Sequence, residues 1–175
     1  MIRIITDSAS DITIEEAKEL GVEVVPLHVI FGNDVFMDGV DISHDEFYKR
    51  LEECDELPKT SQTNPGGFVE VFEKYIKQGD LFVCSSKNEG FSLVIAEAMI
   101  LGLPAISTNC SGPNELLNFG EYGYIVENND KALYKGLKEI INDDKKLQYY
   151  KKKSSERVDF FNYKNRISDI ERLFN

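Results

Sequence analysis

The chain has 175 residues, a mass of 19.9 kDa, a hydrophobic fraction of 42% and a charged fraction of 29%, values typical of a soluble globular protein of about one domain. Its formal charge of −11 is uneven: residues 1–130 carry 24 acidic and 8 basic side chains, and residues 131–175 carry 7 and 12. The acidic body argues against a nucleic-acid-binding surface. The basic end fits a solvated helix face better than a phosphate or membrane patch.

Three cysteines and two histidines show no spacing typical of metal ligands, so we predict no metal and no cofactor. The sparse, odd number of cysteines fits a reducing compartment, and a cytoplasmic location is predicted. The first residues do not resemble a signal peptide. The longest apolar stretch, residues 91–106, is interrupted by polar and helix-breaking residues, so no membrane span is expected.

The first elements predicted in chain order are a strand, a polar turn, a helix and a second strand. A β-branched run at residues 2–6 predicts the strand, and this strand leads into the polar turn Asp7–Asp11. A helix is expected over residues 14–20. Residues 22–31 are predicted to form the second strand, with Pro26 at an edge or a bulge.

Two helices separated by a polar loop are predicted next. Ser43 and Glu46 have the spacing of a capping box and open a helix over about 44–54. Residues 57–64 form the loop. An amphipathic helix then runs from Pro65 to the stop at Gly79.

Strands alternate with helices through the rest of the chain. The pattern predicts strands at 81–84, 104–107 and 122–126, and helices at 92–101, 112–117, 129–142, 144–155 and 163–174. The alternation indicates an α/β fold: a single Rossmann-like three-layer sandwich with a mainly parallel sheet of about five strands and extra C-terminal helices. We expect residues 1–175 to form one merged domain.

Ligands of such sheets bind beyond the carboxyl ends of the strands. The loops that follow predicted strands are therefore the candidate sites, namely Asp7–Asp11, which contains Ser8, and Ser85–Ser92. The loop Thr60–Asn64 is a candidate to join them. His28 lies within an apolar strand and is interpreted as a satisfied core histidine rather than a base.

Residues 1–79 contain three segments that resemble the first half of the N-terminal domain of the DegV family: RIITDSASDI, VEVVPLHVIFGNDVFMDGVDIS and PKTSQTNPGGF. Thr63 stands where that family usually has proline. The resemblance implies binding of a fatty acid, whose carboxylate or activated form is presented to a partner kinase subunit. It also implies that Ser61 donates a hydroxyl to the carboxylate, with Thr60 and Ser8 as further lipid-binding residues.

Residues 80–175 resemble the C-terminal half of the nucleotide-sugar-binding domain of family 4 retaining glycosyltransferases, which have the GT-B fold. The resemblance rests on an E-x7-E motif within SSKNEGFSLVIAEAMILGLP. It implies that Glu89 faces the donor sugar hydroxyls and Glu97 the ribose hydroxyls. The residues between them complete the nucleotide-sugar-binding set, namely Gly90, Phe91 and Ser92.

The spacing of the two glutamates has a physical reading of its own. If Glu89 lies at a helix start, Glu97 is about 12 Å further along the axis. That separation suits the two ends of one extended ligand, and it exceeds the roughly 5 Å of a retaining hydrolase pair. Amides at the helix N-terminus would face a diphosphate, because the helix dipole favours an anion.

The two resemblances meet near residue 80, and for each family this chain contains only a part of the complete protein. The simplest hypothesis is a chimera, engineered or natural, without complete catalytic activity and with weak nucleotide-sugar binding. A fatty-acid-binding module is one alternative, although Glu89 replaces a serine that in the DegV family helps hold the fatty-acid head group, and a carboxylate there would repel a carboxylate ligand. A glycosyltransferase with a separate acceptor-binding subunit is another. The C-terminal apolar residues, Phe160, Ile167, Ile170 and Phe174, are expected to pack on this domain or to form a homodimer contact.

Overall fold

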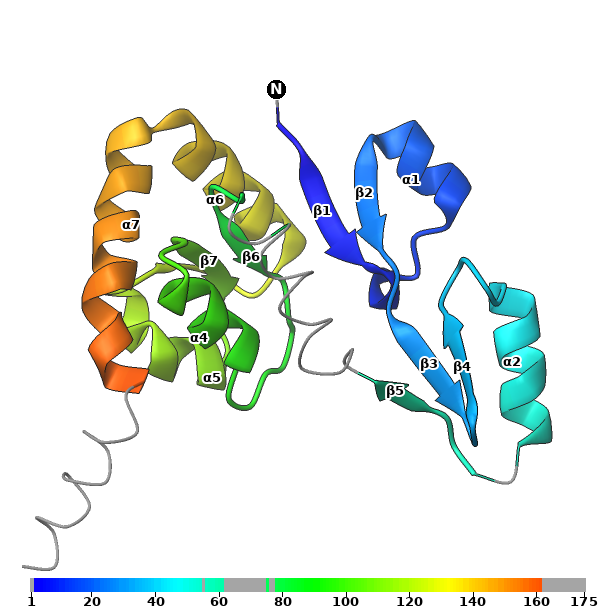
Figure 1. Ribbon diagram of the computed structural model, residues 1–175. Helices are drawn as coiled ribbons and strands as arrows, with labels where there is room; N and C mark the ends of the chain where they lie inside the picture. The colour runs from blue at the N-terminus through cyan, green and yellow to red at the C-terminus, as the bar shows by residue number, and fades with distance from the viewer. Residues whose placement is uncertain (1, 55, 62–74, 76–77, 162–175) are drawn as a thin grey trace, which may run out of the picture. The chain divides into compact units, whose positions relative to one another are not determined.

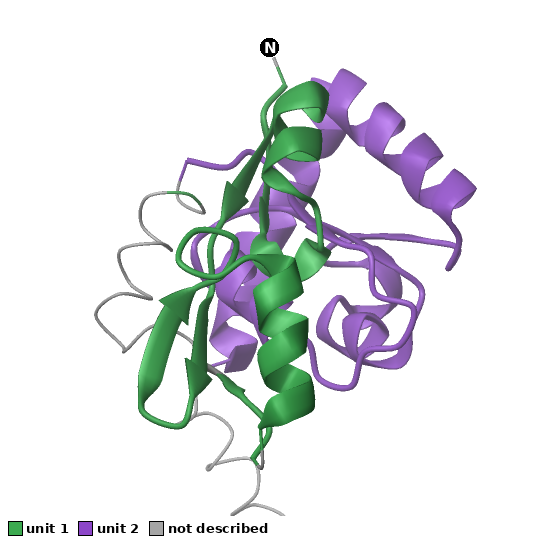
Figure 2. Ribbon diagram, turned by 90° about the vertical axis from the view of Figure 1, so that its right-hand side faces the viewer, with its two compact units in different colours: residues 1–75 green, residues 76–175 purple. Residues whose placement is uncertain are grey.

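The computed structural model describes residues 2–54, 56–61, 75 and 78–161, and it describes Thr60 and Ser61 by their backbone. The chain divides into two compact units, unit 1 (residues 1–75) and unit 2 (residues 76–175), which are green and purple in Figure 2. Both units contain helices and parallel strand pairs, so the predicted α/β class is confirmed. The formation of one merged domain stays a prediction.

Unit 1 begins with a β-α-β segment (Figure 1). It consists of β1 (Ile4–Asp7), α1 (Ile14–Leu20) and β2 (Val22–Val25). The two strands pair in parallel along their whole lengths. A capping box starts α1, because Thr13 Oγ1 accepts from the Glu16 N–H at 3.2 Å and Glu16 Oε2 accepts from the Thr13 N–H at 3.0 Å. Gly21 ends the helix in the left-handed conformation, with φ +66°.

The rest of unit 1 is an antiparallel sheet with one helix. It contains β3 (His28–Phe31), β4 (Asp34–Met37), α2 (His44–Glu53) and β5 (Lys59–Ser61), with the strand order β4-β3-β5. The strand predicted over residues 22–31 is therefore wrong, since it is two strands with different partners. Pro26 has no N–H for a ladder, and the Leu27 N–H donates to Ser8 Oγ.

The core of unit 1 lies between α2 and the antiparallel sheet. Phe31 of β3 packs edge-on against Phe36 of β4 at 6.4 Å and against Phe47 of α2 at 5.7 Å between ring centroids. Arg50 of α2 covers the Phe36 ring, with its guanidinium carbon 4.8 Å from the centroid. The ring contacts hold α2 against the hairpin of β3 and β4. Val29, two residues before Phe31 on β3, is also buried.

The described part of unit 2 is a parallel sheet with four α-helices. In chain order it contains β6 (Phe82–Cys84), α4 (Leu93–Ile100), β7 (Ala105–Thr108), α5 (Ser111–Leu116), β8 (Tyr124–Val126), α6 (Asp130–Asn142) and α7 (Asp144–Arg157). The strand order is β6-β7-β8, with parallel pairing throughout. The described strands form three sheets of two, three and three strands, so a single sheet of about five is not confirmed. The predicted helix at 163–174 lies outside the described residues. So does the predicted helix at 65–79, apart from residues 75, 78 and 79.

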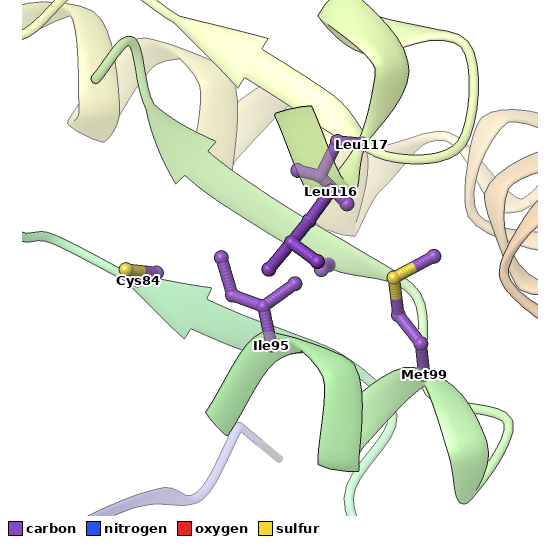
Figure 3. Close-up of a cluster of buried hydrophobic side chains, with 6 residues drawn as sticks. Cys84, Ile95, Met99, Leu116 and Leu117 are labelled. Atoms are coloured by element: carbon purple, nitrogen blue, oxygen red, sulfur yellow. The ribbon is translucent and has the colours of Figure 1, made fainter. Parts of the chain in front are cut away.

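One hydrophobic cluster forms the core of unit 2 (Figure 3). Its buried members are Cys84, Ile95, Met99, Ala105, Leu116 and Leu117. Ile95 and Met99 come from α4, and Ile95 points toward Leu116 at the end of α5. The partly buried Phe161 packs against the same cluster, so the start of the C-terminal segment packs on its own unit. Ile167, Ile170 and Phe174 lie outside the described residues, and a homodimer stays a prediction.

Lys146 of α7 links that helix to α6 and β8. Its Nζ lies 2.6 Å from Glu139 Oε1 and 3.5 Å from the Tyr124 ring centroid, and the Tyr124 hydroxyl donates to Glu139 Oε2 at 2.7 Å. The hydrogen bonds from Lys146 and Tyr124 lower the pKa of Glu139. Burial alone would lower the pKa of Lys146, but its interactions with Glu139 and Tyr124 raise it. This lysine of the basic C-terminal region therefore serves packing within unit 2.

Among the described helices, none combines the length and the apolar composition that crossing a membrane requires.

Candidate functional site

The first candidate site is the turn that follows β1 in unit 1. Ser8–Ser10 forms a short 3₁₀ turn, in which Asp7 Oδ1 accepts from the Ala9 N–H at 3.1 Å and Ser10 Oγ donates to the Asp7 carbonyl at 2.8 Å. Asp11 closes the turn with φ +55°, in the left-handed region that aspartate tolerates better than most residues. These bonds fix the backbone on both sides of Ser8.

Ser8 is the buried polar residue of this turn, with 6% of its surface exposed. Its Oγ accepts a hydrogen bond from the Leu27 N–H at 3.1 Å, just before β3 begins. A serine hydroxyl can also donate one hydrogen bond. Among the described residues no acceptor takes that hydrogen, so the Ser8 hydroxyl is available to an anionic oxygen of a ligand.

His28 lies directly after Leu27 and is the first residue of β3. Its ring is half-buried, and its Nδ1 is buried without a hydrogen-bond partner among the described residues. Leaving a buried polar atom unsatisfied costs about 1–3 kcal/mol. The interpretation of His28 as a satisfied core histidine is therefore wrong. One signal in the sequence could have identified His28 as a candidate functional residue. It is a titratable side chain in an apolar strand, shortly after a proline that interrupts the run.

The Thr60–Ser61 segment of the predicted lipid-binding motif lies on β5. The antiparallel register places Ser61 opposite His28 and Thr60 opposite Val29. The chain thus brings the β1 turn, the start of β3 and the end of β5 to one region of unit 1. Residues 62–64, the rest of this loop, lie outside the described residues.

The second candidate site is the loop 85–92 of unit 2, which follows β6. Three side chains donate hydrogen bonds to its backbone. Thr108 at the end of β7 donates through Oγ1 to the Ser86 carbonyl at 2.5 Å, and Ser111 at the start of α5 donates through Oγ to the Glu89 carbonyl at 3.0 Å. Asn128 in the loop after β8 donates through Nδ2 to the Lys87 carbonyl at 2.7 Å. Sequence reasoning missed Thr108, Ser111 and Asn128. The available signal was their position at or after the ends of predicted strands.

Glu89 and Glu97 have different surroundings in this unit. The helix begins at Leu93, so Glu89 lies in the preceding loop and the premise that it starts the helix is wrong. The expected axial separation of the two carboxylates therefore does not apply. Glu89 Oε2 accepts from Ser86 Oγ at 3.1 Å. Glu97 lies on α4, where burial raises its pKa.

Gly90, Phe91 and Ser92 lead directly into α4. Ser92 is the residue before the helix and is 1% exposed, yet its Oγ has no partner among the described residues and does not cap the helix. Phe91 is half-exposed. Gly90 approaches Gly112 of α5 so closely that a Cβ on Gly112 would lie 1.7 Å from the Gly90 carbonyl oxygen. The site therefore offers backbone amides, one unused buried hydroxyl and two carboxylates.

Comparisons with known proteins give a family match that covers unit 1 and the beginning of unit 2. The family profile described as "Uncharacterised protein, DegV family" matches residues 1–101. A DegV domain-containing protein of Halalkalibacterium halodurans is 41% identical over 111 residues, which are 60% of this chain and 39% of the relative. Another from Caldanaerobacter subterraneus subsp. tengcongensis is 40% identical over 99 residues, which are 57% of this chain and 35% of the relative. The chain spans less than two fifths of the length of these curated relatives.

Two solved structures match this chain to different degrees. Sucrose-phosphate synthase from Thermosynechococcus elongatus has a TM-score of 0.52 and 28% identity, over 60% of this chain and 27% of that chain. DegV, a fatty acid binding protein from Bacillus subtilis, has a TM-score of 0.45 and 20% identity, over 89% of this chain and 53% of that chain. The family match continues past residue 79, where the first resemblance ends, and includes the loop 85–92 and α4. Since the matched residues exceed half of the chain, this chain belongs to the DegV family.

Proposed function

We propose that this chain binds a fatty acid and that the carboxylate of the ligand is held in unit 1 by the Ser8 hydroxyl, with Thr60 and Ser61 of β5 as further binding residues. The observation that carries the proposal is the hydrogen bonding of the Ser8 hydroxyl. Its oxygen accepts from the Leu27 N–H, and no acceptor among the described residues takes its hydrogen. Membership in the DegV family supports the choice of ligand, since solved structures of that family are described as fatty acid binding proteins.

Hydrogen-bond donors, rather than charge, favour unit 1 for the head group. The turn 7–11 carries the carboxylates of Asp7 and Asp11, and the loop 85–92 carries Lys87 and Glu89. Asp7 Oδ1 accepts from the Ala9 N–H at 3.1 Å, and Glu89 Oε2 accepts from Ser86 Oγ at 3.1 Å. The Ser8 hydroxyl, whose hydrogen no described residue accepts, is the donor that unit 1 offers to an anionic head group.

A Ser8→Ala substitution is expected to weaken oleate binding about tenfold, the effect of losing one hydrogen bond to a charged group. It also removes the acceptor of the Leu27 N–H, so the free energy of unfolding should fall by about 1–3 kcal/mol. Isothermal titration calorimetry with oleate, together with urea unfolding, measures the two effects separately.

Ser10→Ala is the matched control, since Ser10 is an exposed serine of the same turn whose hydroxyl donates to the Asp7 carbonyl. It should leave oleate affinity unchanged. Mass spectrometry of lipid extracted from the purified protein gives an independent measurement. A protein that carries no acyl chain and shows no heat with oleate would contradict the proposal.

A second candidate function is weak, metal-independent binding of a nucleotide sugar by loop 85–92 and α4, with Glu89 at the sugar and Glu97 at the ribose. The observation that favours it is the buried, unpartnered Ser92 Oγ at the start of α4, where a phosphate oxygen would accept from it. The similarity in fold to sucrose-phosphate synthase agrees with this reading. The proposal includes the composite origin, with a junction near residue 80 and without a complete catalytic site.

Glu97→Ala is expected to abolish any heat of binding with uridine diphosphate glucose or adenosine diphosphate glucose, because Glu97 is the acceptor for the ribose hydroxyls. Calorimetry in the presence of EDTA tests the binding and its independence of metal together. Glu115→Ala is the control, since Glu115 is an exposed carboxylate of α5 outside the loop. Equal heats for the parent and Glu97→Ala would remove this second candidate.

A further inference from the structure

We propose that His28 Nδ1 is a second hydrogen-bonding group for the carboxyl head group, next to the Ser8 hydroxyl in unit 1. This inference rests on the proposed fatty-acid binding and deepens it. The two residues are joined through Leu27, whose N–H donates to Ser8 Oγ at 3.1 Å and which directly precedes His28. The turn after β1 and the start of β3 therefore lie side by side (Figure 1).

The case for His28 begins with its unsatisfied nitrogen. An imidazole carries a hydrogen-bonding atom at each ring nitrogen, and buried atoms of this kind almost always have a partner. Nδ1 is buried and has none among the described residues, although the ring as a whole is half-buried. A hydrogen-bonding group other than the described residues would complete this nitrogen.

The described side chains next to His28 on its own sheet do not supply that group, and Ser61, opposite it on β5, is described by its backbone alone. The residue opposite it on β4 is Met37, whose thioether is only a weak acceptor. The next residue, Val29, is a buried apolar residue. The Leu27 N–H is already used by Ser8 Oγ.

The chemistry of the neighbouring groups selects a carboxyl group. A carboxylate accepts hydrogen bonds only, so its site must offer donors. The Ser8 hydroxyl is one available donor, and His28 Nδ1 is a second in the tautomer that carries its proton on that nitrogen. An acyl chain that ends in an alcohol offers a neutral oxygen, and hydrogen bonds to a neutral acceptor are about half as strong as those to a carboxylate. The pair therefore gives preference for a fatty acid over the corresponding alcohol.

His28→Leu and His28→Asn form a matched pair of variants. Leucine removes every polar atom, whereas the asparagine amide retains a donor close to the Nδ1 position. We expect His28→Leu to weaken oleate binding about tenfold, as for one hydrogen bond to a charged group, and His28→Asn to retain most of the affinity. Binding of oleyl alcohol should change little in both variants. Titration calorimetry with the full chain measures the affinities of the parent and of both variants for each of the two ligands.

Nuclear magnetic resonance of the parent protein gives a direct readout that does not depend on the variants folding. The sequence has two histidines, so ¹⁵N-labelled imidazoles give two sets of signals. On addition of oleate, the Nδ1 signal of His28 should shift, and the signals of His44, at the start of α2, should not.

The outcomes separate the two proposals. If the parent binds oleate while the His28 signals stay in place and His28→Leu binds equally well, the inference is overturned and the fatty-acid proposal stands. If the parent binds no oleate, both are overturned. A shift of the Nδ1 signal together with a selective loss of oleate affinity in His28→Leu establishes the inference.

Discussion

Replacing Gly112 by alanine is expected to destabilise unit 2 by about 3 kcal/mol, at the upper end of the cost of overpacking. The added Cβ would lie 1.7 Å from the Gly90 carbonyl oxygen and 2.6 Å from the Gly90 carbonyl carbon. Both atoms belong to the backbone, so no flexible side chain can move aside. The loop 85–92 must then shift away from α5, which breaks the hydrogen bond from the Gly112 N–H to the Glu89 carbonyl at 3.1 Å.

The matched control for this substitution is Gly90→Ala, at the other side of the same contact. A Cβ on Gly90 meets no atom within 4 Å, and its backbone does not adopt a positive φ. Its effect on the free energy of unfolding should lie within about 0.5 kcal/mol, as for an ordinary surface substitution. Urea unfolding followed by circular dichroism compares the two variants. Equal midpoints would show that loop 85–92 does not approach α5 as closely as these distances require.

Much of unit 2 could be predicted from the sequence because each element there has a strong local signal. Short buried runs such as Leu81–Cys84 and Pro104–Ser107 predict strands, and the observed β6 and β7 differ from them by a residue at the ends. The helix predicted over 129–142 is α6, which Asn129 caps by accepting from the Ala132 N–H at 2.9 Å. Local capping and burial determine these elements, so reasoning from the sequence alone reaches them.

The parts that could not be predicted depend on pairing between distant segments. Val22–Phe31 is one apolar run, and only the hydrogen bond from the Leu27 N–H to Ser8 Oγ shows why it divides into two strands. The same bond occupies the Ser8 oxygen, and neither the Ser8 hydrogen nor the buried Nδ1 of His28 has a hydrogen-bond partner among the described residues. No spacing rule connects residue 8 with residue 28, because a tertiary contact brings them together.

Replacing Leu116 by alanine is the other substitution with a large expected effect, about 2–5 kcal/mol in the free energy of unfolding. Leu116 is fully buried at the end of α5, in the cluster with Ile95 and Met99 of α4. Truncation removes apolar contacts and leaves a cavity that the surrounding strand and helices can fill only in part. Leu93→Ala is the control, since Leu93 of α4 is 64% exposed and should lose little on truncation.

The same variant tests the prediction that residues 1–175 form one merged domain. In a two-state domain a loss of stability is shared by every amide that exchanges through global unfolding. If the units are one cooperative domain, Leu116→Ala should speed hydrogen exchange in β3 of unit 1 as much as in β7 of unit 2. If they unfold separately, exchange should accelerate in unit 2 alone and urea unfolding should show two transitions. Hydrogen exchange with mass spectrometry resolves the two sets of peptides, and unchanged protection of β3 would contradict the merged domain.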